Sequence, residues 1–213
     1  MREPASKLLL GLLGVMLMGG CSTMTPGNAT PAGTGTSEVS SPQSQSSEPN
    51  SDELPTDGAP KVENPIDTSR FQQDACLSLT TTQSQQLSLG ATGTPVDMPL
   101  GNACEWRNPE TRGNVQIGFL DKDPRGLSAE YKSEKAGRLK VFIELPPVDG
   151  HPAVVRGAID DRENGACTVV VGASDEIAFE VALQLSRTNV GKKDPCKVSA
   201  DVAGMALQTM KQG

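Results

Sequence analysis

The chain has 213 residues, a formal net charge of −7 and five cysteines. An acidic chain offers no basic field for the phosphate backbone of a nucleic acid, so its composition argues against nucleic-acid binding. Aromatic residues make up 3% of the sequence, which means that any hydrophobic core must consist mainly of aliphatic side chains.

The first twenty residues have the pattern of an export signal. Arg2 and Lys7 precede an apolar run over residues 8–18, which is shorter than the roughly 20 residues of a membrane-spanning helix. The run ends in "MGGC" at residues 18–21, which resembles the bacterial lipobox with Met in place of Leu. The resemblance implies cleavage after residue 20, and attachment of diacylglycerol and a further acyl chain such as palmitate to Cys21. The alternative is an ordinary secreted protein with an unrelated cysteine at the cleavage site.

Residues 22–65 consist mainly of Ser, Thr, Pro, Gly, Gln and Asn, with no aromatic residue and no apolar period. Such a segment cannot bury enough surface to offset the entropy of ordering. We therefore expect residues 1–20 to be a lipoprotein signal peptide, and residues 21–65 to be the lipidated cysteine with a disordered tether. Residues 66–213 have the length of a single extracytoplasmic domain.

The first half of the domain contains patterns for helices and a strand pair. Residues 82–85 match a capping box and Gly90 is a candidate C-cap, which together predict a short polar helix. Residues 104–107 and 115–120 are expected to pair as antiparallel strands across "NPETRG". A further helix is indicated at residues 128–135.

Four strands are predicted in the second half, at residues 139–145, 152–159, 167–171 and 177–185. The last of them has the strongest pattern, "IAFEVALQL", in which alternate residues are large and apolar, as in a half-buried strand. Pro146 and Pro147 are expected to end the first one. Because short turns join these strands, the sheet should be mainly antiparallel.

The C-terminal segment has clear helix signals. Asp194 and Pro195 suit the N-cap and the first helical position, and the helix is expected to run to about Met210. Its apolar face follows the i, i+4, i+7, i+8 spacing: Val198, Val202, Met205 and Ala206. The predicted fold is therefore α+β, a mainly antiparallel sheet of about five to six strands with two or three helices packed on one face.

Four cysteines remain once Cys21 is assigned to lipid, and an even number in an exported chain predicts two disulfides. Four cysteines allow three pairings. We favour Cys76 with Cys104 and Cys167 with Cys196, because each pair closes a loop of about thirty residues and joins a helix to a neighbouring strand. The alternative is a four-cysteine metal site, but the sequence has no CxxC pair, so we expect no metal ion.

Several motifs follow the tether in a fixed order: "DACLSLTTTQSQQLSLG", "CEW", "VDGHPAV", "CTVVV" and "DPCKVSADVAGMAL". With the lipobox and the Ser/Thr/Pro tether, this order resembles a family of actinobacterial envelope lipoproteins classed as a domain of unknown function. The resemblance covers most of residues 66–213. It implies an envelope location and an architecture, and it carries no catalytic residue that could be transferred.

Residues with catalytic potential are few. His151 is the only histidine, and no GxSxG motif surrounds a serine, so we expect His151 to be structural rather than a general base. Trp106 is expected to pack on the Cys76–Cys104 bridge, although it is also a candidate for lining a ligand pocket. The acidic pairs lie at predicted turns, where Asp caps backbone N–H groups: Asp121 with Asp123, Asp160 with Asp161, and Asp175 with Glu176.

The sequence thus favours a membrane-anchored extracytoplasmic lipoprotein whose domain is a binding or partner-docking module of the cell envelope. Its expected partners are the lipid bilayer, through the acyl chains on Cys21, and an envelope protein or lipid ligand. We expect no enzyme activity, cofactor or nucleic acid. Two alternatives stay open: a carrier of a small apolar or lipid ligand, and a carboxylate-based hydrolase.

Overall fold

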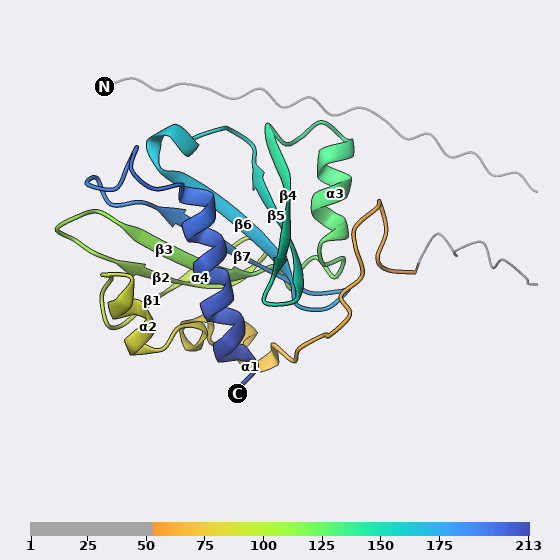
Figure 1. The fold of residues 1–213 in the computed structure, drawn as a ribbon. Helices are drawn as coiled ribbons and strands as arrows, with labels where there is room; N and C mark the ends of the chain where they lie inside the picture. Colours follow the sequence, from red (N-terminus) through yellow and green to blue (C-terminus); the bar gives the residue numbers. More distant parts are fainter. Residues whose placement is uncertain (1–52) are drawn as a thin grey trace, which may run out of the picture. The chain divides into compact units, whose positions relative to one another are not determined.

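The computed structural model of the chain describes residues 53–213 (Figure 1). The predicted signal peptide, Cys21 and the tether up to residue 52 lie outside the described residues. In chain order the elements are α1 (Ser69–Gln73), the 3-10 helix η1 (Ala75–Ser78), α2 (Thr81–Gln86), β1 (Thr94–Met98), β2 (Gly101–Arg107), β3 (Asn114–Phe119), α3 (Ser128–Lys135), β4 (Val141–Val148), β5 (His151–Gly157), the 3-10 helix η2 (Arg162–Asn164), β6 (Ala166–Gly172), β7 (Ala178–Gln184) and α4 (Pro195–Met210). Within residues 53–213, none of the helices combines the length and the apolar character that crossing a bilayer requires.

The seven strands of the described part form one sheet in the order β1-β2-β3-β7-β6-β5-β4, and every neighbouring pair is antiparallel. The α+β class and the antiparallel sheet are confirmed, but the expected counts of about five to six strands and two or three helices were too low. The additional strand is β1, whose sequence "TPVDM" has no alternating apolar pattern. It lies at an edge of the sheet, where Pro95 is tolerated because only one side of the strand is paired.

The main core lies between the sheet and α4, which crosses one face of it (Figure 1). This helix contacts β6 and β7 through fully buried side chains: Val202, Ala203, Ala206 and Leu207. They face the alternate strand residues Val169, Val171, Phe179 and Val181. Because α1 and η1 pack against β2 and add Phe71 and Ala75 to the same core, this face carries most of the apolar burial.

The opposite face of the sheet is also covered, contrary to the expectation that all helices lie on one side. Leu127, the N-cap of α3, and Tyr131, within α3, pack over Val154, Val170 and Ala178 in a second, smaller cluster. These strand residues alternate with those of the main core, and alternate residues of a strand point to opposite faces. The strand at residues 177–185 was therefore wrongly expected to be half-buried: β7 is central and covered on both sides.

Residues 53–65, which the sequence placed in the tether, pack on the folded domain, and we call them the strap. The backbone N–H of Thr56 donates to Ser128 Oγ at 2.8 Å, and that of Val62 donates to Asp175 Oδ1 at 2.8 Å. Val62 is only 5% exposed. The folded domain therefore begins before the predicted boundary at residue 65. Isolated apolar residues such as Val62 are buried against the domain, which composition alone does not reveal.

The short polar helix α2 begins two residues earlier than predicted. Thr80 is the N-cap, and Thr80 and Gln83 form both hydrogen bonds of the capping box. The helix ends at Gln86, and Ser88 takes the left-handed conformation with φ of 57° that was expected of Gly90. The N–H of Ser88 bonds to the carbonyl of Gln85 and that of Leu89 to the carbonyl of Ser84, which is the Schellman pattern of helix termination.

Candidate functional site

A groove runs between β4 and the first half of α4. Its volume is about 760 Å3, and it is open to solvent along one side. Mostly apolar side chains line it: Ile143, Leu145, Pro146, Val148, Pro195 and Ala200. Ile143 leaves 40% of its surface exposed. A concave surface of this size with exposed aliphatic side chains is typical of a ligand or partner site, so we refer to it as the β4–α4 groove.

The outer wall of the groove is β4, an edge strand. The prediction that Pro146 and Pro147 end this strand is wrong, since β4 continues to Val148 with an irregular register between Leu145 and Val148. Proline lacks an N–H group, but an edge strand is paired on one side only, so prolines are tolerated there. The irregular segment brings Pro146 and Val148 into the groove wall.

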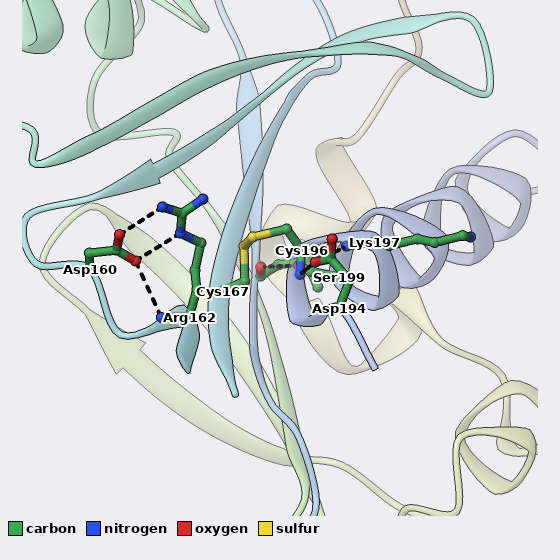
Figure 2. Close-up of a disulfide and its surroundings, with 8 residues drawn as sticks. Asp160, Arg162, Cys167, Asp194, Cys196, Lys197 and Ser199 are labelled. Carbon is green, nitrogen blue, oxygen red and sulfur yellow. Dashed lines mark hydrogen bonds and ion pairs between the residues drawn. A yellow bond between two sulfur atoms is a disulfide. The ribbon is translucent and has the colours of Figure 1, made fainter. Parts of the chain in front are cut away.

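The inner wall is the start of α4, which is fastened to two central strands of the sheet (Figure 2). Asp194 is the predicted N-cap, and its Oδ1 accepts a hydrogen bond from the N–H of Cys196 at 2.8 Å. Cys196 forms a disulfide with Cys167 of β6. One turn on, the buried Ser199 Oγ donates to the carbonyl of Val181 in β7 at 2.8 Å. These links hold the wall in place without filling the groove.

Charged side chains also line the groove, and Figure 2 draws three of them, Arg162, Asp194 and Lys197. Arg162 donates from Nε and Nη2 to the two carboxylate oxygens of Asp160, both at 2.7 Å, and these hydrogen bonds lower the pKa of Asp160 to about 2. Lys197 pairs with Asp201 one turn along α4 at 3.0 Å. Two further carboxylates line the groove without an ion pair within the described residues: Glu163 and Asp194.

A buried ion cluster lies under α3, on the other face of the sheet. Arg156 of β5 contacts Glu180 of β7 in a close ion pair, and its Nε lies 3.6 Å from Glu130 Oε1 of α3. Both glutamates are 7% exposed. Burial raises the pKa of Glu130, and the neighbouring Glu180 adds to the effect while Arg156 opposes it. The sequence did not predict this cluster, because its members lie on three elements that only the fold brings together.

His151 is buried at the start of β5, as a structural role requires. Its Nδ1 lies 2.9 Å from the carbonyl oxygen of Gly172, so Nδ1 carries the proton and donates. Its Nε2 is buried and has no hydrogen-bond partner among the described residues. Burial lowers the pKa of His151 below 6.5. A buried, neutral imidazole that donates to a backbone carbonyl is what the expected structural role of His151 calls for.

The acidic pairs lie in turns and bends between the regular elements, and five of their six members accept hydrogen bonds from nearby groups. Asp123 Oδ1 accepts from Arg125 Nε at 2.6 Å, which lowers the pKa of Asp123. Asp160 holds Arg162 beside the groove, and Asp161 accepts from the Asn164 amide. Asp175 accepts from the N–H of Val62, and Glu176 accepts from Ser174 Oγ at 3.0 Å. Asp121 differs, because its Oδ1 is buried without a hydrogen-bond partner among the described residues. In the other two pairs, the two members bind different partners rather than sharing one site.

The two disulfides in the structure join Cys76 to Cys104 and Cys167 to Cys196, the pairing that the sequence favours. Trp106 is buried two residues after Cys104 on the same strand. A methyl group built on Gly93 would lie 2.3 Å from Cys104 Sγ and 2.7 Å from Cε2 of Trp106. The Cys76–Cys104 bridge and the indole of Trp106 therefore both pack against Gly93, which agrees with the expected packing of Trp106 on the bridge. Trp106 does not line the β4–α4 groove.

Within residues 53–213, no three side chains of His, Cys, Asp or Glu lie close enough together to hold a metal ion. Neither a curated protein nor a solved structure matches the chain significantly. The model of the protein family of unknown function DUF3558 matches residues 16–209. That range covers most of the chain, including every described helix and strand except the last residue of α4. The chain therefore belongs to the DUF3558 family of proteins of unknown function.

Proposed function

We propose that the chain is a lipid-anchored, extracytoplasmic protein of the cell envelope, and that its folded domain is a non-catalytic module that docks a partner in the β4–α4 groove. The observation that carries the proposal is the groove itself, in which aliphatic side chains remain exposed along a concave surface. Water contact with such side chains is unfavourable, and covering them would release that free energy on binding.

The proposed location rests on the N-terminal sequence and on the cysteines. The "MGGC" sequence provides Cys21 for lipidation, and the family match begins at residue 16 and so includes this position. All four of the remaining cysteines are bonded in pairs. Stable disulfides are typical of exported proteins, which supports a domain that works outside the cytoplasm.

The anchor is tested by Cys21→Ala. This variant should lose incorporation of a fatty-acid analogue, and it should be released or remain as uncleaved precursor. The matched control is Cys76→Ala with Cys104→Ala, which removes two cysteines that are bonded to each other and leaves the acylation site intact. Undiminished acyl labelling of Cys21→Ala would exclude the proposed anchor.

The docking site is tested by site-specific photo-crosslinking in the intact cell envelope. A photoreactive side chain replaces Ile143 in the groove or, as a control, Leu100, which lies just after β1 at the other edge of the sheet. These residues are almost equally exposed, at 40% and 41%, so they differ in place rather than in accessibility. We expect a discrete adduct from position 143 and none from position 100. Equal adducts from both, or none from either, would remove the basis for a partner site in the groove.

A carrier of an apolar or lipid ligand is the first alternative, and the groove volume of about 760 Å3 is large enough for one. The open side of the groove weighs against it, because an acyl chain lying there would stay partly in water. Native mass spectrometry of the protein from envelope extracts distinguishes the two, since a carrier should retain a lipid of defined mass.

A carboxylate-based hydrolase is the second alternative, and the raised pKa of Glu130 beside Glu180 is what favours it. Arg156 lies between these carboxylates and pairs closely with Glu180, which ties α3 to the sheet. We therefore propose a structural role for the cluster. Turnover by the purified protein that Glu130→Gln abolishes would favour the enzyme instead.

A further inference from the structure

We infer that the occupant of the β4–α4 groove is a segment of a partner protein that presents an apolar face flanked by basic side chains. This inference rests on the proposed function and names the chemistry of its ligand. Two observations support the inference: the charges at the groove mouth, and the shape of the outer wall that β4 forms.

The groove mouth has an excess of negative charge. Three carboxylates and two cations line it. The cations are Arg162 and Lys197, and the carboxylates are Glu163, Asp194 and Asp201. Asp160 lies beside the groove, where it pairs with Arg162. Asp160 and Asp201 are neutralised by their partners, whereas Glu163 is exposed and has no ion pair within residues 53–213. Charge complementarity at a rim selects partners of the opposite sign, so a basic flank is favoured.

The same charges discriminate against the anionic ligands that would otherwise suit an apolar groove. A fatty acid or an anionic phospholipid would bring its own negative head group to this rim. Like charges brought together at an interface are unfavourable. The excess negative charge at the groove mouth therefore favours a cationic amphipathic segment over a lipid that carries a carboxylate or a phosphate.

The wall favours recognition through side chains. Addition of a strand to β4 uses N–H groups along its outer edge, and Pro146 and Pro147 have none, so this part of the edge cannot donate to an added strand. The wall from Ile143 to Val148 spans about 17 Å at the rise of a strand. This length accommodates roughly three turns of a helix, whose apolar face would lie on Ile143 and Ala200 while its polar face stays in water. A segment of about ten residues is the expected size.

The experiment measures binding of two fluorescent peptides to the full lipidated chain in neutral phosphatidylcholine vesicles, with empty vesicles as the blank. Both peptides are amphipathic helices of roughly three turns with the same leucine face; one has lysine and the other glutamate on the polar face. Fluorescence anisotropy should show that the lysine peptide binds at least about tenfold more tightly, and that its affinity falls as salt is added.

Three variants place the binding site. Ile143→Ser should weaken the lysine peptide because it removes an apolar contact. Glu163→Lys should weaken the lysine peptide by roughly fivefold to tenfold and strengthen the glutamate peptide. The matched control is Glu110→Lys in the β2–β3 turn, which changes the net charge equally. Glu110 is also exposed and without an ion pair within the described residues, and its reversal should leave both affinities nearly unchanged.

The outcomes separate this inference from the proposed function. If Ile143→Ser weakens both peptides equally and Glu163→Lys has no more effect than Glu110→Lys, the groove binds ligands but the basic partner is excluded. If palmitate displaces the lysine peptide at low concentration, or binds where neither peptide does, a lipid ligand replaces the inferred one. If no variant changes any binding, the groove is not a docking site, and the proposed function fails as well.

Discussion

The backbone N–H of Val62 donates a hydrogen bond to Asp175 Oδ1 at 2.8 Å, across 113 residues of sequence. Asp175 lies in the turn between β6 and β7, and Val62 lies in the strap, so this contact holds the start of the domain against the end of two central strands. The folded body thus begins before the position where sequence composition changes. This hydrogen bond and the burial of Val62 hold the strap against the rest of the domain.

Val62→Ala should lower the free energy of unfolding by about 2 kcal/mol, because it removes two buried methyl groups. Asp175→Ala should cost about 1–3 kcal/mol, since it leaves the N–H of Val62 without an acceptor. Asp175→Asn is the control, because its side-chain carbonyl still accepts the bond. Urea unfolding measures all three. Unfolding midpoints that match the parent for both Val62→Ala and Asp175→Ala would show that the strap does not contribute to stability.

The stability of the protein should fall in mildly acidic solution because of His151. Burial lowers the pKa of His151, so the folded state favours the neutral ring. The resulting stability is present above the unfolded-state value near 6.5 and is lost as pH falls through the lower folded-state pKa, by at most about 1.4 kcal/mol per pH unit. Urea unfolding between pH 7.5 and pH 5 measures the loss. His151→Asn, which keeps a donor for Gly172, should reduce this dependence, and an unchanged slope would contradict the assignment.

Substitutions of the different members of the buried cluster under α3 should have different effects on the free energy of unfolding. The pKa of Glu130 is raised, so its contribution to stability is fully present below the unfolded-state value near 4.5 and is lost as pH rises through the folded-state pKa. Glu130→Gln should therefore be neutral or stabilising at pH 8. Arg156→Leu should cost about 3–5 kcal/mol, because two buried carboxylates then lack a counter-charge.

Glu180→Gln is the comparison for Glu130→Gln, since both remove one buried carboxylate and keep its shape. Glu180 is the closer partner of Arg156, so its loss should be destabilising where the loss of Glu130 is not. Urea unfolding at pH 5 and pH 8 supplies the measurement. A loss of stability at pH 8 for Glu130→Gln as large as that for Glu180→Gln would show that Glu130 is held ionised by Arg156.

Each disulfide should stabilise the domain by roughly 3–4 kcal/mol on the chain-entropy estimate, since the bridges close loops of similar length. The replacements are Cys76→Ala with Cys104→Ala, and Cys167→Ala with Cys196→Ala. Non-reducing peptide mapping of the parent should recover only the pairs 76–104 and 167–196. Because the second bridge fastens the inner wall of the β4–α4 groove, only its loss should also alter peptide binding there. Equal effects of the two replacements on binding would show that the bridge has no local role.

Gly204→Ala should stabilise the protein by about 0.5–1 kcal/mol. Gly204 lies inside α4, where glycine is unfavourable. A Cβ atom there would lie 3.7 Å from Val148 Cγ1, an ordinary contact distance. Gly137→Ala is the matched control, because Gly137 also has room for a Cβ but has a φ of +65°, and it should destabilise. Thermal unfolding that ranks the two variants in the opposite order would overturn this account.

The sequence by itself determined the elements whose patterns are local. Asp194 and Pro195 mark the start of α4 because an N-cap and a first-turn proline act on their own neighbours. The alternation over residues 177–185 predicts β7 for the same reason, and the helix at residues 128–135 has the predicted bounds. The cysteine pairing followed from spacing along the chain together with these elements.

Only the tertiary structure decided among local patterns that fit equally well. Both Thr80 with Gln83 and Thr82 with Gln85 fit a capping box in the sequence. The first is used because Gln83 is held by α4: its Nε2 donates to the Met205 carbonyl and its Oε1 accepts from Thr209 Oγ1, both at 2.9 Å. A contact across more than a hundred residues thus sets the register of a six-residue helix.

The candidate site depended on tertiary structure for the same physical reason. The β4–α4 groove exists because a C-terminal helix crosses the sheet beside an edge strand some fifty residues earlier in the chain, a placement that no local pattern encodes. The strap, the second covered face and the Glu130–Arg156–Glu180 cluster likewise join distant segments. Local patterns specify which segments form helices and strands, and the burial of apolar surface between those segments decides which side chains remain exposed to bind a partner.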